Sequence, residues 1–564
     1  MAGAILTPTA LWKDFSVCQD FNFSIVSEQK DGDVILTYFY INGRRVGDSF
    51  VKIYGVLAKT IQQSVGPAIL AVNDFGATDS LTLITDLAKK GYTVMSIDLE
   101  GKTDKTEFFT VYPDKIDYAN YEKAKENLYE IKKDASLSCW YEWACALRYA
   151  LSYLKSRPEV TKVGGFGIGQ GATALWEVAG SSTDLDCVVF ALNTGWTLYR
   201  GTEKFGTVIE PQFTDSMYKF VAGIEPQTYA MHVTCPTLVL STTNSKDYDV
   251  DRAYDTIEKI NKDVYRAIHY SVGYRECVNT HGYRTALVFL DNCLIKENSK
   301  AEGLPGEIDI KCDLVDGKIK VTVLADQNNL TELALFSSEE ITDSKIRNYE
   351  KHLDSKVTEE GREFTYCPFN QSGIAIFFAQ ATYKNGFKIG SKVIAKKFTQ
   401  EEVEFSYKNN VLFSSRIENQ QIVFAPLDQG TEEFAGVNTT EHKIVRLKKG
   451  PMGINGVYSS AGLITFKMNA KKDKPQEQAM LMFDVYSKQS CQMDVILIWD
   501  YYGEKIKYLA KANLVGGELW QNVKLELSKF KTAEGRGIRS LDKIQALAFK
   551  VDSNDYLINN VLWV

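Results

Sequence analysis

The sequence predicts an α/β protein whose doubly wound, mostly parallel sheet is followed by two all-β sandwich domains. Up to about residue 300, apolar strands alternate with helices, a pattern typical of a parallel sheet covered on both faces. A polar linker containing Gly303, Pro305 and Gly306 follows, and beyond it alternating strands replace helices. The 564 residues suffice for about three or four domains. We expect boundaries at 1–300, 305–400 and 403–564.

The expected elements of the first domain follow in chain order. A hairpin comes first, and its two strands are separated by a Lys-Asp-Gly-Asp turn at 30–33. Helix ends are marked by Gly91 and Pro158. The expected strands are 21–26, 34–40, 67–72, 92–97, 163–166, 187–192 and 237–240, and the expected helices are 80–90, 140–154, 172–178, 251–260 and 286–294. The middle domain reads as a small immunoglobulin-like β-sandwich.

Composition excludes several classes of protein. Hydrophobic residues make up 45% of the chain and charged residues 24%, so disorder, collagen and coiled coil are excluded as the overall class. The net charge is −7 and no basic block occurs, which argues against a nucleic-acid partner. No apolar run approaches about 18 residues, so no membrane span is predicted.

Cysteine spacing and the first residues bear on cofactors and compartment. The ten cysteines are scattered and form no CxxC pair, so we expect no metal, no disulfide framework and no cofactor. The N-terminus lacks the charged region and long apolar region of a signal peptide, which predicts a cytoplasmic protein. A secreted protein whose leader has been removed would look the same.

A glycine-rich turn at 164–171 lies between a strand and a helix and has two interpretations. A dinucleotide-binding loop needs glycines at positions one, three and six, and a loop starting at Gly167 offers only Ala172 at the sixth position. A nucleophile elbow, G-x-Nuc-x-G, projects a nucleophile from a sharp strand-to-helix turn. The residues Gly167-Ile168-Gly169-Gln170-Gly171 match the elbow in spacing and context.

From about residue 54 to 294 the chain resembles the α/β-hydrolase superfamily, on the side of the acetyl xylan esterases and dienelactone hydrolases. The segment Asn73-Asp74-Phe75-Gly76 occupies the place of the oxyanion loop, and the stretch 91–101 resembles the "G-Y-x-V … D-x-x-G" of those esterases. The resemblance implies that Gln170, Asp74 and Phe75 hold the oxyanion. The nucleophile position is Gly169, however, and glycine has no side chain that could attack a carbonyl. A serine-hydrolase mechanism through this elbow is therefore excluded.

The resemblance also implies where the other triad members lie, because the superfamily runs nucleophile, acid, histidine. The candidate acids are Asp247 and Asp249, with Asn244 nearer the usual offset, and the alternative is that these residues cap a helix. His281 precedes an apolar helix and fits the histidine position. Whether His281 is still used chemically is a separate question.

Two groups of aromatic residues are candidate sugar-binding positions. Tyr118 and Tyr121 lie in an insertion that would line a substrate cleft or simply pack. The stretches 519–530, 541–549 and 556–561 resemble the galactose-binding-like jelly rolls of carbohydrate-binding modules. In that domain Trp499 and Tyr501 form either a sugar platform or part of a two-faced strand.

Three functions remain open. The first is a catalytically degenerate protein that binds carbohydrate or acylated glycan. The second is a carbohydrate esterase with non-classical chemistry, in which His281 acts as general base on water and backbone N–H groups hold the oxyanion. The third is a structural or interaction protein without a glycan link. The missing serine favours the first over the second.

Overall fold

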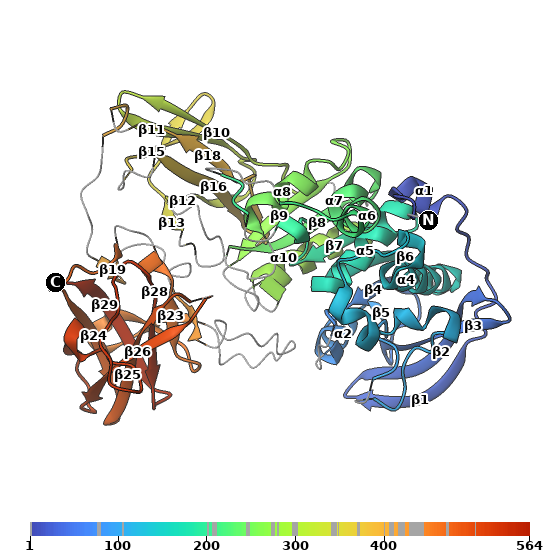
Figure 1. Cartoon of the computed structure of the whole chain (residues 1–564), viewed down its shortest axis with the longest axis horizontal. Helices are drawn as coiled ribbons and strands as arrows, with labels where there is room; N and C mark the ends of the chain where they lie inside the picture. Colours follow the sequence, from blue (N-terminus) through green and yellow to red (C-terminus); the bar gives the residue numbers. More distant parts are fainter. Residues whose placement is uncertain are drawn as a thin grey trace.

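A computed structural model of the chain describes residues 3–75, 80–103, 106–199, 202–205, 211–243, 249–271, 277–278, 281–295, 303–339, 347, 349–368, 373–399, 401–404, 411–415, 424–427, 445–469, 473–501 and 503–564. Within these ranges the largest sheet has 14 strands in the order β1-β2-β3-β5-β4-β6-β7-β8-β9-β17-β16-β12-β13, with β18 paired to β16. Figure 1 shows this sheet running through the N-terminal and middle parts of the chain.

The central part of this sheet is parallel. Strands β5, β4, β6, β7, β8 and β9 run in one direction, while β3 is antiparallel to β5. The strands of this half are β1 (Ser24–Asp31), β2 (Val34–Val46), β3 (Ser49–Thr60), β4 (Gly66–Val72), β5 (Thr93–Ile97), β6 (Val160–Ile168), β7 (Cys187–Ala191), β8 (Thr237–Thr242) and β9 (Arg266–Ser271). The predicted strands lie inside or close to these bounds.

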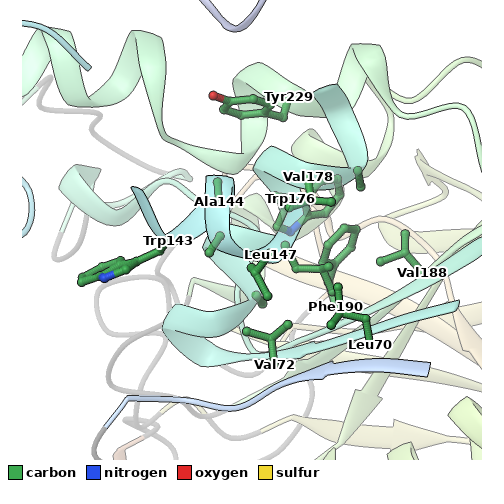
Figure 2. Close-up of a cluster of buried hydrophobic side chains, with 14 of the residues drawn as sticks. Leu70, Val72, Trp143, Ala144, Leu147, Trp176, Val178, Val188, Phe190 and Tyr229 are labelled. Carbon is green, nitrogen blue, oxygen red and sulfur yellow. The ribbon is translucent and has the colours of Figure 1, made fainter. Parts of the chain in front are cut away.

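Helices cover both faces of the parallel strands, as the sequence predicts. Leu70 and Val72 of β4 face one core, and Ile69 and Ala71 face the other, because successive strand residues point to opposite faces. The first core holds α4 and α5, and the second holds α2 and α10. Figure 2 shows part of the first core, where the rings of Trp176 and Phe190 stack with centroids 3.7 Å apart. The described α-helices are α1 (Pro8–Trp12), α2 (Ser80–Lys89), α3 (Tyr121–Ala124), α4 (Cys139–Ser156), α5 (Gly169–Ser181), α6 (Asp215–Gly223), α7 (Pro226–Tyr229), α8 (Val250–Ile257) and α10 (His281–Leu290).

The middle strands continue the same sheet. Strand β17 pairs with β9 through Gly390 and Ile268, and the Tyr270 hydroxyl donates to the Ser391 carbonyl at 3.0 Å. The added strands are β12 (Leu330–Ser338), β13 (Glu350–His352), β16 (Ile374–Tyr383), β17 (Lys388–Gly390) and β18 (Ile394–Lys397). A second sheet consists of β10 (Asp309–Val315), β11 (Lys318–Leu324), β15 (Gly361–Tyr366) and β14 (Lys356–Thr358). The boundary near residue 300 therefore separates segments of the sequence that share one sheet.

The C-terminal strands form two antiparallel sheets around a core of their own. Within the described residues the sheets hold 6 and 5 strands, and Figure 1 shows them apart from β1–β9. Their strands are β19 (Val411–Phe413), β20 (Ala425–Pro426), β21 (Arg446–Lys449), β22 (Asn455–Tyr458), β23 (Leu463–Thr465), β24 (Met480–Ser487), β25 (Cys491–Trp499), β26 (Ile506–Leu514), β27 (Gln521–Glu526), β28 (Ile544–Val551) and β29 (Tyr556–Trp563). Among the described residues, no helix is long and apolar enough to cross a membrane.

Candidate functional site

A sharp turn joins β6 to α5 at the glycine-rich motif. Gly169 begins α5 with a φ of +56°, in the left-handed region that favours glycine. A Cβ atom on Gly167 would lie 2.8 Å from the Cα of Ala172, and one on Gly171 would overlap the Asn73 carbonyl oxygen. The turn closes because these flanking positions lack side chains. This is the strand-to-helix geometry predicted for a nucleophile elbow.

The carboxylate of Asp74 occupies the space beside Gly169. A Cβ atom on Gly169 would lie 2.5 Å from Asp74 Oδ1 and closer still to Cγ. The Gln170 backbone N–H donates to Asp74 Oδ1 at 2.8 Å, and the Phe75 N–H donates to the same atom at 3.1 Å. Two N–H groups that are expected to hold a substrate oxyanion thus converge on one point. The oxygen atom at that point belongs to Asp74. The sequence predicts that Asp74 helps to hold the oxyanion, whereas its carboxylate itself accepts these two N–H groups.

Strand β7 and the loop after it support the turn. The Asn193 side-chain amide donates to the Gly169 carbonyl at 3.2 Å and to Thr173 Oγ1 at 2.6 Å. The Trp176 indole N–H donates to the Asn193 carbonyl at 3.1 Å. Asn193 is itself buried, so these bonds are shielded from water. The Asn193 side chain therefore joins Gly169 to Thr173 and stabilises the first turn of α5.

Of the two tyrosines predicted to line a cleft, Tyr121 lies near the elbow. Its ring centroid is 5.4 Å from that of Phe75, whose ring packs at 4.6 Å against Trp143. Burial and the nearby carboxylates of Glu100 and Asp74 raise the pKa of Tyr121. The aromatic insertion therefore forms one wall of the candidate site.

Tyr118 has a different environment. Its hydroxyl donates to Glu142 Oε1 at 3.2 Å, and Glu142 is buried and bonded to Arg44 Nε at 2.7 Å. The insertion that carries both tyrosines is anchored by Asp98, which accepts the backbone N–H groups of Glu100 and Thr110 at 3.0 and 2.6 Å. Burial raises the pKa of Asp98 to about 6.

The structure describes only part of the segment that is predicted to hold the catalytic acid. Asp247 and Asn244 lie outside the described residues. Asp249 caps α8 by accepting the Asp251 N–H at 2.9 Å, and it pairs with Arg252 NH1 at 2.6 Å. Asp249 therefore has the capping role that was the alternative to a catalytic one.

A buried ion pair next to this position was missed by sequence reasoning. Arg347, from the middle part of the chain, bonds both carboxylate oxygens of Asp251 at 2.5 and 2.9 Å. Both side chains are almost fully buried. The two residues are far apart in sequence, and we find no local pattern that predicts their pairing.

His281 is the first residue of α10 rather than part of a preceding loop. Its neighbours include Lys388 of β17 and Arg284, and burial together with these two positive charges lowers its pKa to about 4. His269 lies close by in β9, where burial lowers its pKa to about 3. At neutral pH both imidazoles are uncharged, and His281 is a weaker base than an ordinary histidine.

The predicted platform in the C-terminal sheets is not open. Trp499 is 4% exposed and Tyr501 is 3% exposed. Arg539 and Lys543 lie 4.9 and 4.8 Å from the centroid of the Trp499 ring. The interpretation of these rings as a sugar platform is therefore corrected, because buried rings covered by cations offer no face for a sugar.

Among the comparisons with known proteins, the solved structures described below match about half of the chain. No model of a protein family matches, and no curated protein matches in sequence. A cold-adapted esterase from an Arctic intertidal metagenomic library is similar over 48% of this chain and 99% of its own, at 15% identity and a TM-score of 0.34. An acetyl xylan esterase from a Paenibacillus species is similar over 47% and 86%, at 13% identity and a TM-score of 0.34. One from a Thermoanaerobacterium species is similar over 45% and 82%, at 14% identity and a TM-score of 0.34.

The class of protein is defined by the sheet and the turn rather than by these likenesses. Six parallel strands are covered on both faces, and a strand-to-helix elbow follows β6. The chain therefore has an α/β-hydrolase-like fold, extended by further β sheets.

Proposed function

We propose that this chain is a carbohydrate-associated protein that kept the α/β-hydrolase-like fold, lost hydrolysis through its elbow and acts by binding glycan. One observation carries the proposal. Gly169 supplies no nucleophile, and the Asp74 carboxylate accepts the N–H groups that a substrate oxyanion would need. A triad enzyme without its nucleophile keeps only the small rate that binding and oxyanion stabilisation provide. In this chain the N–H groups that would stabilise the oxyanion are also occupied, by the Asp74 carboxylate.

The binding part of the proposal has two supports. The C-terminal strands form two antiparallel sheets around one core, which agrees with a galactose-binding-like jelly roll. At the elbow, the half-buried rings of Tyr121 and Phe75 line the side next to Asp74. Aromatic faces of this kind suit sugar rings. We propose the glycan contact at Tyr121, because Trp499 and Tyr501 are covered.

The first experiment measures hydrolysis of a small activated acetyl ester and of acetylated xylan by the wild type and by His281→Ala. We expect no rate above background from either protein. A wild-type rate well above background that collapses in His281→Ala would overturn the loss of catalysis.

The second experiment measures binding of xylan-derived and other oligosaccharides to the full chain. Tyr121→Ala is expected to weaken binding about tenfold, the order of a lost stacking contact. Tyr218→Ala removes a ring that is 53% exposed on α6 and serves as the matched control. No saccharide binding by the wild type would reject the glycan link and leave the structural or interaction role.

A second candidate function, a carbohydrate esterase with non-classical chemistry, is favoured by one observation. The N–H groups of Gln170 and Phe75 still converge on one point, so an oxyanion could bind there if the Asp74 carboxylate moved away. Asp74→Ala would then raise ester hydrolysis above the wild-type rate. Asp48→Ala, which removes a fully exposed carboxylate, is the control. An unchanged rate in Asp74→Ala rejects this candidate.

A further inference from the structure

A cavity lies at the other end of α5 from the elbow. It has a volume of about 480 Å³ and is lined by α1, α4, the end of α5 and the short turn 230–232. Since α5 spans 13 residues, its two ends are about 18 Å apart. The cavity is therefore distinct from the candidate site at Gly169.

The cavity is lined by cationic side chains that have no internal acceptor. Arg148 is half-buried, and within the described residues its guanidinium makes no hydrogen bond or ion pair. It lies over two aromatic rings, 5.3 Å from the centroid of Trp12 and 4.4 Å from that of Phe15. Burial lowers the pKa of Arg148, and the nearby carboxylate of Asp184 offsets only part of that shift. The ammonium of Lys13 likewise has no acceptor among the described residues.

Other polar groups face the same space. Ser181 Oγ is buried without a hydrogen-bond partner in the part of the chain that is described, and His232 adds an imidazole. The carboxylate in the lining belongs to Asp184, and one of its oxygens accepts the Ser182 hydroxyl at 2.8 Å. Positive charge exceeds negative charge in the cavity. Buried polar groups are normally paired, so the Ser181 hydroxyl and the half-buried Arg148 guanidinium, which have no acceptor among the described residues, are open to a ligand in this cavity.

We propose that this cavity binds a small organic anion through a carboxylate or phosphate group held by Arg148, with Lys13 and Ser181 as further donors. A guanidinium presents a planar fork of donors that matches either group with two parallel hydrogen bonds. The volume lies within the range of small-molecule sites and exceeds the need of a lone inorganic ion.

The test is titration calorimetry on the full chain in a buffer free of phosphate and carboxylate. The probes are glucuronate, glucose 6-phosphate and inorganic phosphate, with neutral glucose and sodium chloride of equal ionic strength as ligand controls. We expect glucuronate or glucose 6-phosphate to bind, and glucose and chloride not to. The two sugar anions distinguish a carboxylate ligand from a phosphate ligand. Tight binding of inorganic phosphate alone would overturn the organic-anion assignment.

The variants test the named donors. Arg148→Gln is expected to weaken binding about tenfold or more, the effect of losing a charge-assisted hydrogen-bond pair. Lys13→Gln, at an exposed position, is expected to weaken it about two- to fivefold. Arg45→Gln, on β2 with a 64% exposed side chain, is the matched control and should bind like the wild type.

Two results would overturn the proposal. One is the absence of binding of every anion by the wild type. The other is equal affinity in the wild type, Arg148→Gln and Lys13→Gln. If Arg148→Gln fails to fold, the anion affinities of Lys13→Gln and His232→Gln still test the proposal. Both side chains lie outside the hydrophobic core clusters, so these variants are expected to fold.

Discussion

The two ends of α5 deal with hydrogen-bond donors in opposite ways. At the N-terminal end, the backbone N–H groups beside Gly169 are saturated by the Asp74 carboxylate. At the C-terminal end, the guanidinium of Arg148 and the hydroxyl of Ser181 face a cavity and have no acceptor within the described residues. At the N-terminal end the anion that pairs with the donors belongs to the chain itself. The chain leaves donors open where no reaction is expected.

We therefore expect a ligand to bind more readily at the C-terminal end of α5 than at the elbow. A donor that is already paired inside the chain must lose that bond before it can bind anything else. A donor without an acceptor in the protein exchanges only its water contacts when a ligand binds.

The first prediction concerns how much a buried ion pair contributes to the free energy of unfolding. Arg347→Met leaves the buried carboxylate of Asp251 unpaired and should lower the free energy of unfolding by about 3–5 kcal/mol. Arg45→Met breaks an exposed pair with Asp48 and should cost less than about 1 kcal/mol. Urea unfolding of the full chain measures both. Equal losses would mean that the Asp251 pair is not shielded from water.

The second prediction tests whether Gly169 and Asp74 depend on each other. Gly169→Ala forces a side chain into a left-handed position and against the Asp74 carboxylate, and it should cost about 3 kcal/mol. In Asp74→Ala the second penalty disappears, so the double variant should be about 2 kcal/mol more stable than additivity predicts.

Gly32→Ala is the matched control for that cycle. Gly32 has a φ of +62° and nothing within 4 Å of a Cβ atom, so only the backbone penalty of about 1–2 kcal/mol remains. Strict additivity between positions 169 and 74 would show that the carboxylate does not fill the elbow in solution.

The third prediction concerns a group that the fold keeps uncharged. The pKa of His281 is about 4 in the folded chain and about 6.5 when unfolded, so the unfolded state binds more protons between these values. Stability therefore falls as the pH drops below about 6.5 and levels off below about 4. From about pH 7.5 to 5 this loss should reach up to about 2 kcal/mol.

His281→Gln should remove that part of the pH dependence and leave stability at pH 7.5 nearly unchanged. Chemical unfolding at several pH values gives the comparison. His269 titrates in the same direction and is coupled to His281, so the difference between the two curves reports His281 together with its effect on His269. Parallel curves would contradict the low pKa.

The fourth prediction concerns Arg148, at the cavity beside the C-terminal end of α5, and its expected effect on stability is the smallest. Arg148→Gln removes two cation–π contacts and no hydrogen bond from the described residues, so the free energy of unfolding should change by about 1 kcal/mol or less. Thermal or urea unfolding in a buffer without added anions measures it. A loss comparable to that of Arg347→Met would mean that Arg148 is already paired, and the contrast between the two ends would fail.

Local patterns predicted the parallel strands, the helices on both faces and the turn at Gly169. These features depend on residues close in sequence, such as the flanking glycines at 167 and 171, whose spacing directly limits the backbone. The place of the Asp74 carboxylate was not predictable in this way. Asp74 and Gln170 are 96 positions apart, and their contact depends on how β4 and β6 are placed side by side.

Other misses have the same cause. The alternation around Trp499 fits a half-buried strand, but the cations that cover its ring come from positions 539 and 543, in another part of the fold. The linker near residue 300 suggested separate domains, whereas edge pairing between β9 and β17 is set by the assembled sheet. The lining of the cavity beside Arg148 is drawn from four separate segments, so no single motif marks it.

The joint between β9 and β17 has a practical consequence for anyone who would study the first half of the chain alone. Cutting before β10 would remove the partner of β9 and leave its backbone N–H and C=O groups on an open edge. Open edges of this kind invite pairing with another molecule and aggregation. It would also take away Arg347, the counter-charge of Asp251. We therefore expect that the hydrolase-like part does not behave as an independent domain. An excised fragment would self-associate and would not report on the activity of the intact protein.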